Sequence, residues 1–313
     1  MVNTTSMDDF VLLGFPGRWE IQLLLFVSFL LIYISAVLEN IVIITLLTVD
    51  SHLHTPMYFF LGNVSFLEIW YTSITVPKML TSFISSKNTI SYTGCLAQLH
   101  FFTFLGGTEC LLLAVMAYDR YIAICRPLHY MQIMDHSTCV CLVSGAWLVG
   151  FLTPVLPIVL LTRLQFCGPN IINHFFCDFS PLLRLSCSDI HTNEIVDFAV
   201  SAVILVSSVL VISSSYFQIV LTVWRMPSAV GRRKAFSTCA SHLTVVLVFF
   251  GSLSFMYIRV TTIPSFDMNK VVAVFYAVII PLLNPMIYCL RNREVKEALR
   301  RTLQRIKSVT NLR

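Results

Sequence analysis

Long apolar runs, separated by short polar segments, are the dominant pattern along this chain of 313 residues. A transmembrane helix needs roughly 20 mainly apolar residues, and seven stretches are long enough. Their apolar positions are continuous rather than alternating, which excludes the short strands of a membrane β-barrel. The pattern therefore predicts seven transmembrane helices. They are expected at residues 22–49, 57–80, 95–121, 138–161, 195–224, 236–258 and 270–290.

Composition places most of the chain in lipid. It is 57% hydrophobic and only 12% charged, with a mean hydropathy of +0.80, whereas a soluble domain carries about 25% charged residues. We expect an all-α membrane protein: a seven-transmembrane helix bundle over residues 22–290, an N-terminal tail over 1–21 and a C-terminal segment over 291–313. Prolines inside the runs, such as Pro154 and Pro285, are expected to kink these helices without ending them.

The distribution of Lys and Arg predicts the orientation of the bundle. With the N-terminus extracellular, 14 of the 21 Lys and Arg residues fall on the cytoplasmic side, and cytoplasmic loops normally carry this excess. We therefore expect a multi-pass protein of the plasma membrane with a cytoplasmic C-terminus. The net charge of +5 is then mainly charge facing the lipid of the inner leaflet, not a nucleic-acid site.

Both ends of the chain carry further signals. Residues 1–20 contain no short apolar run of the kind that is cleaved, so the first helix is expected to act as an uncleaved anchor. Asn3 begins Asn-Thr-Thr, which is a glycosylation sequon. Residues 292–306 separate apolar from basic positions and predict a short amphipathic helix. Its apolar positions are Val295, Leu299, Leu303 and Ile306, and its basic positions are Lys296, Arg300, Arg301 and Arg305.

Ten cysteines divide between the two sides of the membrane. Four of them fall at or between the outer helix ends, in an oxidising compartment; these are Cys95, Cys167, Cys177 and Cys187. Four cysteines allow three pairings, and spacing alone does not choose among them. The other six, within the membrane or on the inner side, are expected to be free thiols.

Several long motifs occur in order along the chain. They are LHTPMYFFLGNVSFLEIWYTSITVPKML (53–80), MAYDRYIAICRPLHY (116–130), Ser215-Tyr216, KAFSTCASHLTVV (234–246) and PLLNPMIYCLRN (281–292). Together they resemble the olfactory receptors, which are rhodopsin-like G-protein-coupled receptors. The short third outer loop, near residues 259–270, is similar to that of the tetrapod-type class.

The resemblance implies two disulfides and a conformational switch that couples the receptor to a G protein. It implies Cys95–Cys177 between the third helix and the second outer loop, which leaves Cys167–Cys187 as a second bridge. On the cytoplasmic side, the sixth helix would move outward and open a cleft for a stimulatory olfactory-type G protein, with cyclic AMP as the signal. The residues that this switch would use are Asp119, Arg120, Tyr216, His242 and Tyr288.

A face of small and aromatic residues on the third helix is a candidate ligand site. Phe102, Thr103, Gly106, Gly107 and Cys110 share it at helical spacing. Such a face also allows close helix packing, and both roles can hold at different depths. At Phe102, receptors for amines carry an acid, so its absence argues against a charged amine and favours a small, mostly neutral volatile odorant.

By resemblance, the odorant cavity lies above this face. Its other walls would come from the fifth and sixth helices, and its lid from the second outer loop. The residues implied are Thr103, Gly107, Ser201, Ile204, Leu253, Ser254 and Tyr257, with Phe179 in the lid.

Carboxylates inside the membrane form a second candidate site. Glu39 stands where the family usually has Gly, and Glu68 where it usually has Asp. An ionised, unpaired acid is costly there, so Glu68 and Glu109 either share the sodium ion that the resemblance implies or are protonated and hydrogen-bonded to Asn40 or Asn284. No other cofactor is expected.

Other functions have weaker support. His174, Cys177 and Asp178 could hold a metal ion, but a disulfide at Cys177 would remove its thiolate. No arrangement typical of an enzyme occurs. Intramembrane acids and prolines also suit a transporter or channel, yet the seven runs show no internal repeat.

Overall fold

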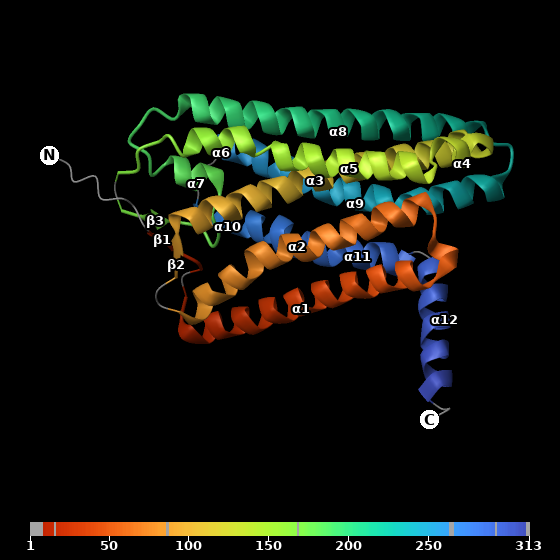
Figure 1. The fold of residues 1–313 in the computed structure, drawn as a ribbon, viewed down its shortest axis with the longest axis horizontal. Helices are drawn as coiled ribbons and strands as arrows, with labels where there is room; N and C mark the ends of the chain where they lie inside the picture. Colours follow the sequence, from red (N-terminus) through yellow and green to blue (C-terminus); the bar gives the residue numbers. More distant parts are fainter. Residues whose placement is uncertain are drawn as a thin grey trace.

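The chain forms a bundle of long helices. The computed structural model describes the backbone of residues 9–15, 17–85, 88–167, 169–262, 266–291 and 293–310, with most of their side chains. In this part of the chain the long helices make seven rods along one axis (Figure 1), and each predicted run lies within one rod. The rods are α1 (Trp19–Val49), α2 (Pro56–Ile84), α3 (Tyr92–Cys125), α5 with α6 (His136–Leu152, Val155–Leu161), α8 (His191–Arg225), α9 (Ala229–Thr262), and α10 with α11 (Phe266–Val274, Ile280–Arg291).

Apolar side chains cover the outside of this bundle and polar ones lie within it. Leu24 of α1 and Phe217 of α8 are 66% and 62% exposed, whereas Asn40, Glu68 and Glu109 are buried. Five of the described helical segments are long and apolar enough to cross a membrane: Trp19–Val49, Tyr92–Cys125, His136–Leu161, His191–Arg225 and Lys270–Ile287. This inversion of the soluble pattern suits lipid as the surrounding solvent.

Two rods depart from a regular α-helix. The fourth is interrupted at Thr153 and Pro154, because proline lacks the N–H that would continue the hydrogen-bond ladder. The seventh contains a π-helical turn over Phe275–Ile279, which changes the direction in which the following side chains point. Pro77 and Pro285 lie inside α2 and α11 without ending them, as the sequence predicted.

A small sheet, which the sequence analysis did not predict, lies at one end of the bundle, called here the sheet end. Its strand β1 (Asp9–Leu12) pairs antiparallel with β2 (Thr89–Ser91) and parallel with β3 (Ile171–Ile172). Phe10 points inward and is fully buried. The N-terminal segment is thereby fixed against two loops that are distant in sequence.

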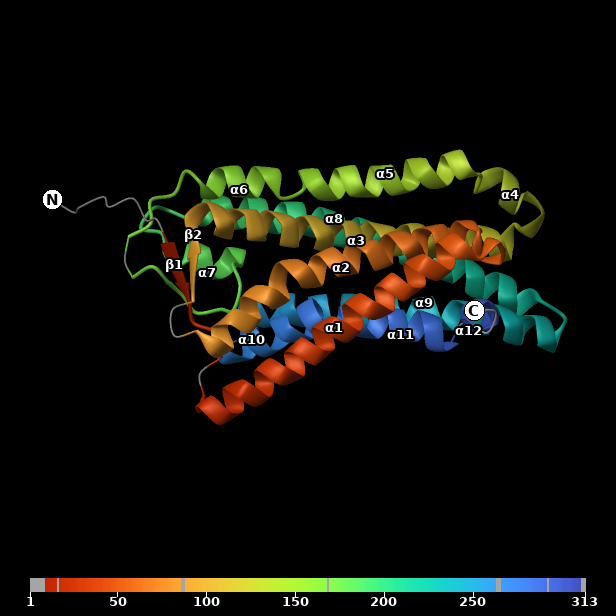
Figure 2. The same ribbon diagram turned by 60° about the horizontal axis from the view of Figure 1, so that its bottom comes forward.

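Both disulfides that the resemblance implied are present at the sheet end. Cys95 of α3 is bonded to Cys177, with 5.4 Å between their Cα atoms, and Cys167 is bonded to Cys187 at 5.6 Å. The loop between α6 and α8 also contains a short helix, α7 (Phe179–Leu183), whose N-terminus is capped by Asp178. Figures 1 and 2 show the sheet and α7 at the same end.

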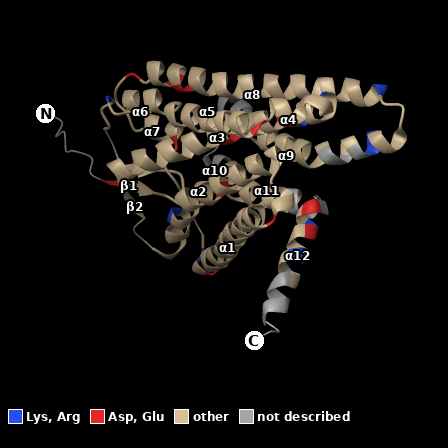
Figure 3. Ribbon diagram, turned by 45° about the vertical axis from the view of Figure 1, so that its right-hand side comes forward, with Lys and Arg blue, Asp and Glu red and all other residues tan. Residues whose placement is uncertain are grey.

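The opposite end, called here the α12 end, carries α4 (Tyr130–Ile133) and α12 (Arg293–Thr310). Lys and Arg gather at this end, on α8, α9 and α12, while the middle of the bundle is almost free of them (Figure 3). α12 is the helix that was predicted at residues 292–306. One of its basic side chains, Arg301, is paired with an acid of the bundle. Its guanidinium donates twice to Asp50 Oδ2, at 2.9 and 2.7 Å, beside the end of α1.

Gly150 allows α5 to pack closely against α3. A Cβ atom there would overlap the Thr108 hydroxyl and approach the Phe104 carbonyl oxygen to 3.1 Å. We therefore expect Gly150→Ala to lower stability by about 1–3 kcal/mol, the usual cost of overpacking. The readout is the melting temperature of purified receptor in detergent. Gly145→Ala is the matched control on the same helix, because no atom lies within 4 Å of its Cβ position. Equal melting temperatures for the two variants would contradict this packing.

Candidate functional site

A cavity of about 290 Å³ opens between the rods near the sheet end. Its walls come from α2, α3, the break between α5 and α6 at Thr153, α8, α9, the π-helical turn and the loop that carries α7. Aromatic rings form one wall: the ring of Phe102 lies 5.0 Å from Tyr71 and 5.8 Å from Tyr276, centre to centre. The lining is mainly apolar with a few polar groups, as small-molecule sites usually are.

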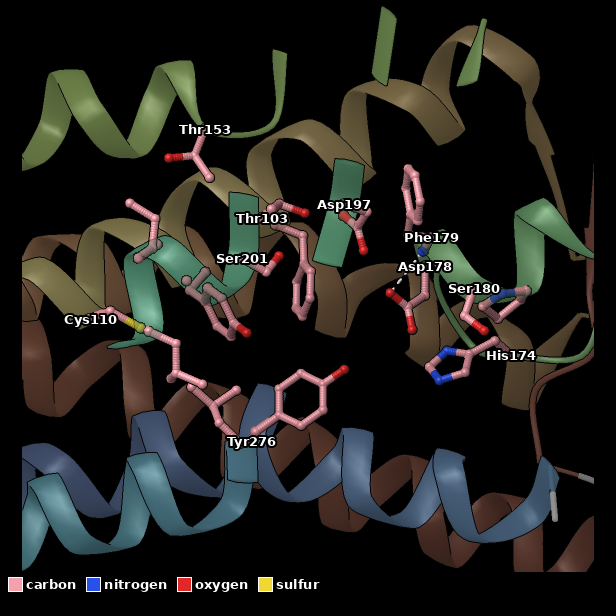
Figure 4. A pocket seen from close by; sticks show the side chains of 18 of the residues that line it. Thr103, Cys110, Thr153, His174, Asp178, Phe179, Ser180, Asp197, Ser201 and Tyr276 are labelled. Carbon is pink, nitrogen blue, oxygen red and sulfur yellow. Dashed lines mark hydrogen bonds between the residues drawn. The ribbon is translucent and has the colours of Figure 1, made fainter. Parts of the chain in front are cut away.

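Polar groups meet at the loop side of this cavity. Figure 4 shows the carboxylates of Asp178 and Asp197 and the hydroxyls of Ser201 and Tyr276 pointing into the same space. Asp178 is held by its bond with the Phe179 N–H, which donates to Oδ1 at 2.8 Å. Burial raises the pKa of Asp178, and this hydrogen bond partly opposes the rise.

His174 also lines the cavity but is neutral at physiological pH. Burial, followed by the charge of Lys270, lowers the pKa of His174 to about 3. Its Nδ1 accepts from the Phe176 N–H at 3.4 Å. The metal alternative loses one ligand, because the sulfur of Cys177 is consumed by the bridge to Cys95.

Eight of the ten residues predicted to bind ligand surround this one cavity. They are Phe102, Thr103, Gly106, Gly107, Phe179, Ser201, Ile204 and Leu253. Ser254 is exposed and is not part of the lining, because its position on α9 turns it outward. Tyr257 lies outside the residues whose side chains the structure describes. That these residues contact an odorant stays a prediction.

Four further lining residues, Asp178, Asp197, Tyr71 and Tyr276, were not predicted to bind ligand. Asp197 stands one helical turn before Ser201 and two before Ile204, so the spacing on α8 could have identified it. Asp178 lies in a loop, where no periodicity exists. Tyr276 sits in the π-helical turn, where the ordinary helical period fails, and Tyr71 reaches the cavity from α2.

Gly106 leaves space that a side chain would fill. A Cβ there would meet only the Tyr71 ring, at 4.0 Å, so a larger residue would extend into the cavity without striking backbone. Gly106→Leu should reduce potency about tenfold or more for most ligands, since filling an occupied space costs about 1–3 kcal/mol. The measurement is a dose–response series at equal surface level. The control is Gly251→Leu on α9, which is exposed with no atom near its Cβ position; unchanged potency for Gly106→Leu would place the ligand elsewhere.

The intramembrane acids form one cluster deeper in the bundle. The Asn284 amide donates to Glu68 Oε1 at 2.6 Å and to Glu109 Oε1 at 3.3 Å. Glu68 and Glu109 are 1% and 2% exposed. Among the described residues, the amide oxygens of Asn40 and Asn284 are buried without a hydrogen-bond partner. Two carboxylates around one amide would repel each other if both were ionised, and either a proton or a cation would remove this repulsion.

The predicted switch residues form two separate contacts toward the α12 end. Asp119 Oδ1 accepts from the Tyr130 hydroxyl at 2.8 Å, and Asp119 Oδ2 lies 3.4 Å from Arg120 Nη2. Tyr216 of α8 bonds His242 Nδ1 of α9 at 2.7 Å. Tyr288 lies outside the residues whose side chains the structure describes.

His242 also joins α9 to α3. Its Nε2 lies 3.2 Å from the carbonyl oxygen of Leu113. A carbonyl only accepts, so Nε2 carries the proton and Nδ1 accepts from the Tyr216 hydroxyl. This single ring thus connects three rods.

Comparison with known proteins identifies the family. A family model described as "Olfactory receptor" matches residues 29–306. The chain belongs to the olfactory receptor family. It is 56% identical to human Olfactory receptor 6Q1 over 302 residues, covering 96% of this chain and 95% of that protein. It is 54% identical to rat Olfactory receptor 226, covering 95% and 92%.

A solved structure supports the same fold. Squid rhodopsin superposes with a TM-score of 0.70 at 18% identity, covering 93% of this receptor and 88% of that chain. The protein is therefore a multi-pass, seven-helix receptor of the rhodopsin-like class. Receptors of this family signal through a G protein in response to small molecules and are not enzymes, which favours the receptor over the transporter or channel alternative.

Proposed function

We propose that this olfactory receptor binds a small volatile odorant with a mainly apolar body in the cavity and activates a stimulatory olfactory-type G protein, raising cyclic AMP. The observation that carries the proposal is the cavity itself, which is lined by the face of α3 that the sequence singled out. The receptor stands in the plasma membrane with its sheet end outside and its α12 end in the cytoplasm. The Lys and Arg residues at the α12 end support this orientation.

Coupling follows from a ligand that binds one bundle arrangement better than another. In the arrangement described here, His242 holds α9 against α3 and α8. Outward movement of α9 at the α12 end breaks the His242 contact with Leu113. The cleft so formed exposes Arg120, which is 7% exposed when paired with Asp119, to the C-terminal helix of the Gα subunit.

The acid cluster takes up a neutralising positive charge. Either a proton or a sodium ion sits on Glu68 and Glu109. The amide oxygens of Asn40 and Asn284, which have no hydrogen-bond partner among the described residues, are suitable partners for both. Sodium would supply a charge that favours one arrangement of the bundle. A change of basal signalling with sodium concentration, lost in Glu109→Gln, supports the ion; no salt response supports the proton.

The test is a panel of small volatiles applied to cells that carry the receptor and the olfactory stimulatory Gα, with cyclic AMP as the readout. We expect a concentration-dependent rise for at least one compound, and its loss in cells without that Gα. Robust signals that persist without that Gα would overturn the coupling. Uptake of a compound without any G-protein signal would favour a transporter.

A further inference from the structure

We propose that the cavity recognises a primary or secondary amine, whose cationic head lies between Asp178 and Asp197 while its apolar body lies against Phe102 and Ile204. This inference rests on the proposed function and names the ligand class of the same site. It departs from the sequence-based expectation of a neutral ligand, which relied on the lack of an acid at Phe102. The structure supplies two acids from other elements.

The carboxylates of Asp178 and Asp197 are placed to contact a ligand in the cavity. Asp197 comes from α8 and Asp178 from the loop before α7, and both point into the cavity (Figure 4). Among the described residues, Asp197 accepts no hydrogen bond, and Asp178 accepts one, from the Phe179 N–H. Several acceptor sites on the two side chains therefore remain for N–H groups, which an ammonium provides.

A buried hydroxyl independently indicates a ligand. Tyr276 is only 5% exposed, and its oxygen has no hydrogen-bond partner among the described residues. It points into the cavity opposite Asp178 (Figure 4). A buried polar group without a partner is costly, and a bound amine would satisfy it by donating to this oxygen.

The charge balance and the rings of the lining also suit a cation. Among the lining residues that the structure describes, the charged groups are two carboxylates and one guanidinium, that of Arg184, which has an interaction of its own; His174 is neutral. Lys270 directs its ammonium at the carbonyls of Leu13 and Gly14 and is not part of the lining. The rings of Tyr71, Phe102 and Tyr276 also line the cavity, and aromatic rings attract cations.

The experiment compares matched ligands on the whole receptor. Straight-chain primary amines, the corresponding alcohols and the corresponding carboxylic acids are tested by two readouts: the melting temperature of purified receptor, which reports binding, and cyclic AMP in cells, which reports coupling. We expect amines to raise the melting temperature and cyclic AMP at concentrations at least about tenfold below those of the alcohols, with no response to the acids.

Two variants test whether Asp197 and Asp178 contact the ammonium group of the ligand. Asp197→Asn and Asp178→Asn should each reduce amine potency roughly 10- to 100-fold, the value of a charge-assisted hydrogen bond, and leave alcohol responses nearly unchanged. Asparagine can still cap α7 at position 178. Asp189→Asn is the control, because Asp189 is exposed and bonds only the backbone of His191 among the described residues.

The outcomes separate the two proposals. Stabilisation by amines without cyclic AMP supports the amine site and contradicts the G-protein assignment. If alcohols stabilise the receptor and raise cyclic AMP while amines are inert, the amine site is overturned and the proposed function stands. Equal potency of amines on the wild type and on Asp197→Asn also overturns the amine site.

Discussion

Cys95→Ser should remove the receptor from the cell surface. Cys95 and Cys177 are both fully buried, in a cluster with Phe10 and Leu99. The Cys177 N–H also donates to the Gln98 side chain of α3 at 2.9 Å. Loss of a native disulfide commonly costs about 2–5 kcal/mol, which is a large part of the stability of a typical domain. The next residue, Asp178, would then lose its fixed position over the cavity.

The measurement is the surface fraction of epitope-tagged receptor in intact cells, followed by the cyclic AMP response. Cys141→Ser is the control, because Cys141 is a free, exposed cysteine on α5, and it should behave as wild type. Normal surface level and response for Cys95→Ser, or a free Cys95 thiol in active receptor by mass mapping, would contradict this role.

Arg120→Ala should abolish cyclic AMP signalling while odorant binding is retained. The guanidinium lies at the α12 end of α3, far from the cavity at the sheet end, and its described ion pair is with its neighbour Asp119. Removing it takes away the group that the G protein would contact, and it leaves Asp119 with the Tyr130 hydroxyl alone. Ligand-induced stabilisation of purified receptor should therefore persist, with the cyclic AMP signal at background.

Arg126→Ala is the matched control for this variant. Arg126 is exposed and follows the last turn of α3, so its loss removes a charge at the α12 end without breaking a described internal contact. It should reduce signalling only slightly. Robust cyclic AMP from Arg120→Ala at equal surface level would contradict the switch.

The helices could be predicted from the sequence because lipid imposes a simple requirement on each of them. A run such as 195–224 must satisfy its backbone within one helix, so composition alone identifies it, and α8 contains the whole run. The interruption at Thr153 was not predicted, although Pro154 was recognised. Whether a proline kinks or interrupts a helix depends on whether neighbouring groups donate hydrogen bonds to the carbonyl oxygen that the proline leaves unpaired.

The cavity could be predicted only where periodicity applies. Thr103 and Gly106 follow the face of α3, and both line the cavity. Asp178 and Tyr276 do not follow such a rule, because one lies in a loop and the other in the π-helical turn. The acids of the lining were therefore missing from the sequence-based argument against an amine.

The sheet has a consequence for how this receptor matures during its synthesis. Strand β1 pairs with residues 89–91 and 171–172, so this early strand of the nascent chain waits for partners that are made long after it. Contacts between distant segments form slowly. The layer at the sheet end, including the bridge between Cys95 and Cys177, therefore closes only after the first four rods have been synthesised. An oxidising enzyme that acts earlier would meet Cys95 without its partner.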